Sequence, residues 1–128
     1  MTKKILQSIW PALIWSVIIF ILLIIPGKDL PHAPEMPLLD KVIHFSLFGM
    51  FVFIWCSYYG YRLPSQTVGI FFLVFIISCI YGIGMEFIQK YFVANRGFEW
   101  GDIVADVVGS FTGWQACRLS FSKKHKGL

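Results

Sequence analysis

Four long apolar segments dominate this chain and restrict what it can fold into. The first covers residues 9–25 without a charged residue, and the others cover residues 41–59, 68–92 and 102–121. A helix needs roughly 20 mostly apolar residues to cross a bilayer. Only 14% of the residues are charged, against about a quarter in soluble proteins. We therefore predict an all-α fold, a bundle of four transmembrane helices that forms one domain over residues 1–128.

The distribution of charge predicts how these helices are oriented. Seven basic residues and no acid fall on the side of the two chain ends, and all seven acids with four basic residues fall on the other side. Loops rich in Lys and Arg stay in the cytoplasm, so both termini are expected inside (N-in, C-in). A signal peptide would have the same basic and apolar start, but no small-residue cleavage site follows it. We interpret residues 9–25 as an uncleaved spanning helix.

Acids placed inside the apolar segments mark a candidate site. Glu86 lies within the third segment, and Asp102 and Asp106 open the fourth. A charged side chain within a bilayer costs a few kcal/mol, so it usually faces protein or water and is a candidate functional residue. If the helices alternate in direction, these acids reach the same depth near the outer face as His44 and Gln89.

The spacing within each helix agrees with one shared polar face. Side chains three or four residues apart stack on one side of a helix, and the pairs are Asp40 with His44, Glu86 with Gln89, and Asp102 with Asp106. Small residues continue these faces, namely Ser78 and Gly82 in the third helix and Gly109 and Gly113 in the fourth. Small residues let helices approach closely, so we expect the third and fourth helices to pack through these faces.

Several of these residues have a second interpretation. Arg96, in the loop between the third and fourth helices, is the expected counter-ion of the acids, with Lys41 and His44 as further candidates. Asp40 and Asp102 either belong to the site or only cap their helices. The whole polar layer is either a site or a network that only sets the helix register.

Other classes of function receive no support from the sequence. The three cysteines lie inside apolar segments and are interpreted as buried thiols. No stripe of basic residues lies in a soluble segment, so no nucleic-acid partner is predicted. No full metal-binding signature is present and no cofactor is predicted, although a metal ion held by His44, Glu86 and either Asp102 or Asp106 is a geometric option. The expected partners are membrane lipids.

The pattern of polar residues resembles the VanZ-like family. The resemblance covers residues from about 38 to 116, and it rests on Asp40-Lys41-x-x-His44-Phe45, Glu86-x-x-Gln89, Arg96, and Asp102-x-x-x-Asp106-x-x-Gly109. Members are small integral membrane proteins, often with Asn at the position of Asp106, and the namesake is linked to low-level resistance to teicoplanin. The resemblance implies a multi-pass protein of the bacterial cytoplasmic (inner) membrane, part of the cell envelope.

Two functions follow from this pattern. The first is binding, without catalysis, of a lipid or glycan headgroup or a lipoglycopeptide-type antibiotic in an outward-facing pocket formed by Asp40, Lys41, His44, Glu86, Gln89, Arg96, Asp102 and Asp106. Many acceptors and few cations favour sugar hydroxyls or an amine over a bare phosphate. The second is an enzyme that uses paired carboxylates and a His on a lipid-linked substrate at the outer leaflet. Without a catalytic motif, the first is preferred. A proton or ion pathway ranks last, because the polar residues stop in the outer leaflet.

Overall fold

The chain folds into helices that run side by side. The computed structural model describes residues 2–25, 37–94 and 97–126. These residues contain no strand, and their elements are α1 (Thr2–Leu6), α2 (Trp10–Ile24), α3 (Pro37–Arg62), the short 3-10 turn η2 (Pro64–Gln66), α4 (Thr67–Phe92) and α5 (Trp100–Lys126). The all-helical prediction is confirmed.

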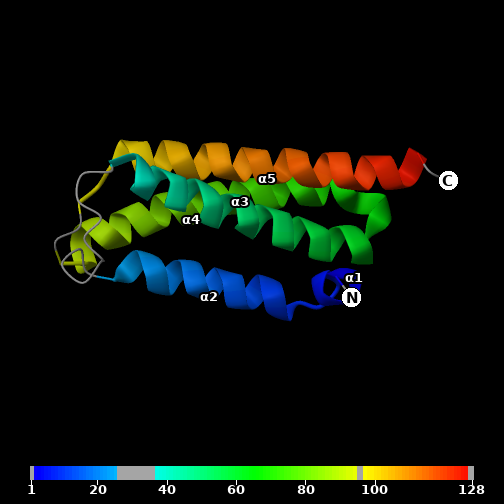
Figure 1. Cartoon of the computed structure of the whole chain (residues 1–128), viewed down its shortest axis with the longest axis horizontal. Coiled ribbons are helices and arrows are strands. Elements are labelled where there is room, and N and C mark those ends of the chain that lie inside the picture. Colours follow the sequence, from blue (N-terminus) through cyan, green and yellow to red (C-terminus); the bar gives the residue numbers. More distant parts are fainter. Residues whose placement is uncertain (1, 26–36, 95–96, 127–128) are drawn as a thin grey trace.

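The four long helices run alternately in opposite directions (Figure 1). Both chain ends and the turn between α3 and α4 lie at one end of the bundle, which we call the terminal end. The end of α4 and the beginnings of α3 and α5 meet at the other end, which we call the loop end. Contacts between α3 and α5 are the most extensive of any pair, whereas α2 touches α3 and α4 more sparsely.

Two helices begin earlier than the sequence suggested. Helix α3 begins at Pro37 and α5 begins at Trp100. Proline suits the first helical position because its missing N–H has no partner there anyway and its φ is preset for a helix. Asp40 and Asp102 therefore lie within the first turns, and the interpretation of either as the N-cap is wrong. An acid in the first turn still interacts favourably with the positive end of the helix dipole.

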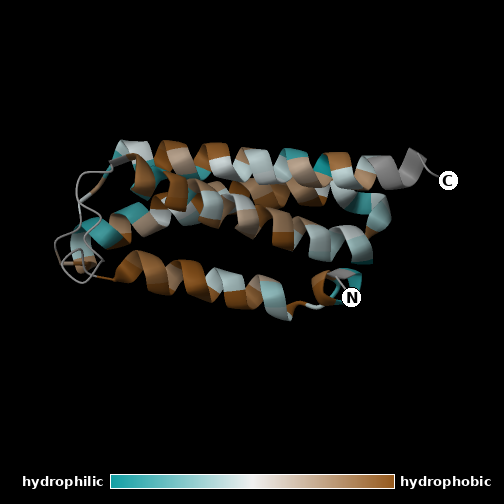
Figure 2. Ribbon diagram, viewed as in Figure 1, coloured by the Kyte–Doolittle hydropathy of each residue, from teal (hydrophilic) through white to brown (hydrophobic). Residues whose placement is uncertain are grey.

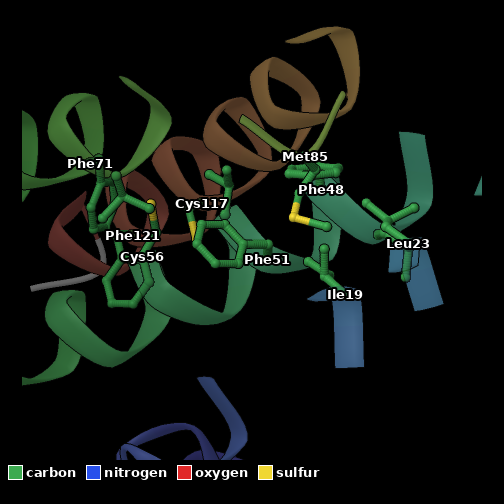
Figure 3. Close-up of a cluster of buried hydrophobic side chains, with 12 residues drawn as sticks. Ile19, Leu23, Phe48, Phe51, Cys56, Phe71, Met85, Cys117 and Phe121 are labelled. Carbon is green, nitrogen blue, oxygen red and sulfur yellow. The ribbon is translucent and has the colours of Figure 1, made fainter. Parts of the chain in front are cut away.

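An apolar core fills the centre of the bundle (Figure 3). It draws side chains from all four long helices, and its labelled members are Ile19, Leu23, Phe48, Phe51, Cys56, Phe71, Met85, Cys117 and Phe121. Cys56 and Cys117 are buried thiols, as predicted, while Cys79 is only half-buried. Close van der Waals packing of large side chains of this kind favours association of the helices.

The outer surface is apolar as well. Ile14 of α2, Ile80 of α4 and Leu119 of α5 are more than half exposed, and brown, hydrophobic residues cover most of α2 and the middle of the bundle in Figure 2. Polar side chains lie inside instead, for example Ser78 and Ser110, whose hydroxyls are 2.7 Å apart. A water-soluble protein has few large exposed apolar patches, so this inverted arrangement suits a lipid environment.

Two helices are long and apolar enough to cross a membrane. By length and composition these are Leu38–Arg62 and Pro64–Phe92, within the described residues. Helix Trp10–Ile24 is apolar but shorter, and α5 is long but carries more polar residues. These properties indicate a membrane protein.

The glycines of α5 face α3 rather than α4. A Cβ atom at Gly109 would lie 2.2 Å from the carbonyl oxygen of Phe45, and one at Gly113 would lie 2.3 Å from the carbonyl oxygen of Gly49. The prediction that this pair packs against the third spanning helix is therefore wrong. In α4, by contrast, Gly82 does face α5, because a Cβ there would meet the side chain of Asp106. Each residue of a helix is rotated by about 100° from the one before it. Asp106, which meets Gly82 of α4, and Gly109, which meets Phe45 of α3, therefore lie about 60° apart around α5.

Candidate functional site

A buried layer of polar side chains lies near the loop end of the bundle. It is formed by the first turns of α3 and α5 and the last turns of α4, which meet at this end (Figure 1). His44, Glu86, Gln89, Asp102 and Asp106 are all buried there. The structure thus brings most of the sequence-predicted site residues to one depth, closed off beneath the surface.

His44 is the centre of this layer. Its Nδ1 lies 2.8 Å from Oδ1 of Asp106, a hydrogen bond between two fully buried side chains. Its Nε2 lies 3.7 Å from Oδ2 of Asp102, which is too long for a hydrogen bond. Within the described residues this nitrogen is buried without a hydrogen-bond partner. The imidazole therefore stands between two carboxylates and is bonded to only one of them.

Lys41 closes the layer towards the surface. Its Nζ donates to Oε2 of Glu99 at 2.6 Å and to Oδ1 of Asp102 at 2.7 Å. The lysine is 30% exposed and Glu99 59% exposed, whereas Asp102 is buried. Gly101 makes room for this lysine, since a Cβ there would lie 2.6 Å from its Cε. Lys41 thus takes the counter-ion role that the sequence assigned first to Arg96, which lies outside the described residues.

Glu86 is held by the backbone of the following loop. One oxygen, Oε2, accepts a hydrogen bond from the backbone N–H of Glu99 at 3.1 Å. The other oxygen, Oε1, is buried without a hydrogen-bond partner among the described residues, as is Oδ2 of Asp106. Lys90 does not neutralise it there but lies over the rings of Tyr91 and Phe98. An incompletely satisfied buried carboxylate is costly and calls for a proton, a water or a cation.

Gln89 belongs to a different contact. Its side-chain amide donates to the backbone carbonyl of Leu23 at 2.8 Å, so it binds the end of α2 rather than the acids. Asp40 stays close to the layer, since one carboxylate oxygen can lie within 4.8 Å of ligand atoms of His44 and Asp102. The seven of the proposed residues that the structure describes thus divide into a His–carboxylate centre, a lysine rim and a link to α2.

Glu99 is the site residue that the sequence analysis missed. It binds Lys41 through its side chain and Glu86 through its backbone. Its signal in the sequence was its place directly before α5, on the side that holds every other acid. The fourth helix was expected to begin at Asp102, which left Glu99 in the short loop before it, whereas α5 begins at Trp100, directly after Glu99.

The layer offers two trios of possible metal ligands. Asp40, His44 and Asp102 form one, and His44, Glu86 and Asp106 form the other, each with ligand atoms within 4.8 Å of one another. The His–carboxylate pair also has the arrangement by which a carboxylate orients an imidazole for acid–base work. Around these residues, the described part of the chain supplies five carboxylates and a single lysine.

Three cavities of the described structure lie away from this layer. One of about 690 Å³ lies at the terminal end beside Arg118, and one of about 350 Å³ lies beside Tyr81. The third, of about 660 Å³, follows α3 and α5 from Val42 to Ala116, and we call it the α3–α5 groove. Its lining is almost wholly apolar, and it starts at the residue that follows Lys41.

Comparisons with known proteins give one family and one relative. The model of the VanZ/LLP1 family matches residues 2–121. The chain is 35% identical over 95 residues to an uncharacterized protein of the fission yeast Schizosaccharomyces pombe. That match covers 71% of this chain and 55% of the yeast protein, so the chain spans about half the length of this relative. No solved structure matches.

Proposed function

Because this chain belongs to the VanZ/LLP1 family, we propose that it is an integral membrane protein that crosses the bilayer four times and binds a lipid. In this proposal α2, α3, α4 and α5 are the crossings and both termini lie in the cytoplasm. The resemblance stated above points to the cytoplasmic membrane of a bacterium. The likeness to a yeast protein means that membership alone does not restrict the source to bacteria.

Four crossings agree with the outward faces of the helices. Each long helix presents large apolar side chains outwards, such as Ile14 of α2, Met50 of α3, Ile80 of α4 and Val104 of α5. At about 1.5 Å per residue, the 26 residues of α3 and of α4 reach about 39 Å. That length exceeds the hydrocarbon core of about 30 Å, so the polar layer would lie close to one membrane surface.

The α3–α5 groove carries the proposal that the ligand is a lipid. It is an apolar cavity of about 660 Å³ on the lateral surface of the bundle, lined by residues that include Phe45, Met50 and Gly113. Such a volume is within the usual range for small-molecule sites. One end of the groove lies at Val42, which follows Lys41 in α3, so this end of the groove is the one nearer to the charged rim of Lys41 and Glu99. An acyl chain in the groove would place its headgroup at that rim.

The charges at the rim favour one kind of headgroup. Glu99 is the most exposed charged side chain there, and its carboxylate shares Lys41 with Asp102. The described layer holds five carboxylates, with Lys41 bonded to two of them and Lys90 nearby in the last turn of α4, and this excess of acceptors disfavours a bare phosphate. An amine or the hydroxyls of a sugar can instead donate to the carboxylates. A lipid-tailed glycopeptide has the same two parts and is a second ligand for the same site.

Native mass spectrometry of the protein extracted with lipid tests this proposal. We expect one retained lipid per chain, with phosphatidylethanolamine or a glycosyl diacylglycerol preferred over phosphatidylglycerol. Met50→Trp should fill the groove and reduce retention at least tenfold. Ile80→Trp is the matched control, because Ile80 is exposed on α4 and lines none of the three cavities. Equal lipid retention by both variants would rule out the groove as the site of the acyl chain. A changed headgroup preference in Glu99→Gln would support the rim as the site of the headgroup.

Catalysis on a lipid-linked substrate is the second candidate. It is favoured by the 2.8 Å contact between His44 and Asp106, in which the carboxylate orients the imidazole. Lipid extracts of cells that carry His44→Gln, compared with cells that carry the unchanged protein, distinguish the two. A substrate that accumulates in the variant supports an enzyme, whereas unchanged extracts together with unchanged lipid retention support binding alone.

A further inference from the structure

The unused nitrogen of His44 is the strongest unexplained feature of the polar layer. The Nδ1 atom is occupied by Asp106 at 2.8 Å, and the side chain is fully buried. In a neutral imidazole whose Nδ1 donates its hydrogen to this carboxylate, Nε2 carries a lone pair and no hydrogen. That lone pair points to the side of Asp102, whose Oδ2 lies 3.7 Å away. Two acceptors facing each other in a buried site repel, and a proton, a water or a cation between them relieves that repulsion.

We propose that Asp40, His44 and Asp102 bind one divalent first-row transition metal ion, such as Zn²⁺ or Mn²⁺. Asp106 is then the positioning residue that orients His44 through Nδ1, and water completes the coordination. This site is independent of the lipid proposed for the α3–α5 groove. It differs from the sites that the sequence suggested, in which His44 and Glu86 are joined by either Asp102 or Asp106.

The distances agree with an ion at this place. Ligand atoms about 2.0–2.2 Å from a tetrahedral metal lie about 3.5 Å from one another, and Nε2 of His44 and Oδ2 of Asp102 are 3.7 Å apart. Ligand atoms of these two residues and Asp40 lie within 4.8 Å of one another. Asp40 and His44 are four residues apart in α3, the spacing that puts two ligands on one face of a helix.

The surrounding residues form the outer shell that metal sites use. A ligating histidine usually donates its other ring N–H to a carboxylate, which fixes the tautomer and the ring orientation, and Asp106 is placed for that role. Oδ1 of Asp102 accepts from Lys41 at 2.7 Å, which leaves its Oδ2 for the ion. A divalent ion would also balance the excess of carboxylates in the layer.

Two further points favour this trio over the other. At the alternative site, Nδ1 would be the ligand and Nε2–H would need an acceptor, but Asp102 is too far away to accept from it. In addition, Glu86 and Asp106 are at most 1% exposed, whereas Asp40 is half-buried and lies beside the exposed rim. An ion can therefore reach Asp40 from the surface. An imidazole ligand favours a transition ion over Mg²⁺ or Ca²⁺.

Metal analysis of the full chain in nanodiscs provides the first test. The protein is stripped with EDTA, reloaded with Zn²⁺ or Mn²⁺ and analysed by mass spectrometry for metal content. We expect about one ion per chain and a higher unfolding temperature with the ion than without it, because binding to the folded state stabilises it. A loading below a tenth of an equivalent for both ions would overturn the proposal, whatever the lipid content of the sample.

A matched pair of variants identifies the ligands. Asp40→Asn and Glu86→Gln each remove one carboxylate charge from the same layer. We expect Asp40→Asn to weaken binding at least tenfold and to abolish the thermal shift, with Glu86→Gln within threefold of the unchanged protein. The opposite pattern would assign the ion to His44, Glu86 and Asp106 and overturn this proposal. Unfolding without metal checks that both variants fold.

The role of Asp106 has a spectroscopic test. In protein loaded with Mn²⁺, electron spin echo spectra should show coupling to a histidine nitrogen, and His44→Gln should abolish it. Asp106→Asn should keep this coupling but weaken affinity about 10- to 100-fold, as substitution of an outer-shell partner commonly does. Loss of the coupling in Asp106→Asn would make Asp106 part of the coordination itself, and unchanged affinity would remove its positioning role.

Discussion

His44 is the fully buried side chain at the centre of the polar layer. Its ring touches Asp106 on α5 and faces Asp102 one turn earlier on the same helix. Removing one partner of a buried pair is costly because the other is left without compensation. His44 therefore contributes to the contact between α3 and α5, whatever else the layer does.

Replacement of His44 by Ala is expected to lower the free energy of unfolding by about 3–5 kcal/mol, because Asp106 loses its buried donor. Unfolding by SDS in mixed micelles, followed by circular dichroism, measures the change. Val42→Ala on the same helix is the control, since Val42 is 57% exposed and should change stability by about 0.5 kcal/mol or less. Similar losses in both variants would mean that the pair adds no stability.

At the scale of elements, close approach of α3 and α5 depends on glycine. At Gly109 and Gly113 a Cβ would meet backbone carbonyls of Phe45 and Gly49. Backbone atoms cannot rotate away as the end of a flexible side chain can, so the helices would have to separate. Gly84 of α4 is different, because nothing lies within 4 Å of its Cβ position.

Gly109→Ala and Gly113→Ala are each expected to lower the free energy of unfolding by about 1–3 kcal/mol, the usual cost of overpacking. Gly84→Ala is the matched control and should instead raise it by up to about 1 kcal/mol, because Ala favours a helix. The same SDS titration measures all three. If Gly109→Ala is as stable as Gly84→Ala, the close contact between α3 and α5 does not exist.

Helix α2 is attached by Ile19 and Leu23, which pack in the apolar core, and by side chains that donate to backbone carbonyls. Tyr81 donates to Ser16 at 2.8 Å, Gln89 donates to Leu23 at 2.8 Å, and Nε1 of Trp15 donates to Leu47 at 2.9 Å. The other contacts of α2 are few. Because the attachment rests on few bonds, each should affect how often α2 separates from the bundle.

Tyr81→Phe removes one of these bonds and leaves the ring in place. A loss of about 1 kcal/mol should raise hydrogen exchange of the α2 amides about fivefold, with little change in α5. Exchange followed by mass spectrometry measures this in nanodiscs. Tyr91→Phe is the control, since Tyr91 is 66% exposed near the end of α4. Equal exchange in both variants would show that the Tyr81 hydroxyl does not hold α2.

At the scale of the whole molecule, charge is divided between the two ends of the bundle. Among the described side chains, Lys3, Lys4, Arg62 and Arg118 are basic residues in or near the terminal end, and no acid accompanies them. The acids of the polar layer lie towards the loop end. Basic ends stay in the cytoplasm, so this division predicts that the polar layer is near the outer surface.

Labelling with a membrane-impermeant maleimide tests this orientation. In a background without the native cysteines, Gly97→Cys should react in intact cells and Ser65→Cys only after lysis. Both positions are exposed, so a difference between them reports the side of the membrane. The reverse pattern would invert the topology, and reaction of both in intact cells would contradict a crossing by α4.

Much of this architecture is determined by the sequence alone. Long apolar segments determine helices, because a continuous apolar segment of about 20 residues matches a spanning helix, which satisfies its own backbone in lipid, and is too long for a strand of a membrane barrel. Acids inside those segments determine a polar layer, since the helices alternate in direction and bring Glu86 and Asp102 to one depth. The residues of the layer could therefore be named before their contacts were known.

The contacts themselves were decided by the tertiary structure. Spacing gives the position of Gly109 around α5 relative to Asp106, but it does not say which helix lies on each side. A rotation of α5 by about 60° about its own axis would change the helix that Gly109 faces from α4 to α3. The same rotation decides that Lys41 reaches Glu99 and Asp102. Which nitrogen of His44 is free likewise depends on where two carboxylates lie in space. Sequence spacing is one-dimensional, and these choices are set by how three helices pack around one another.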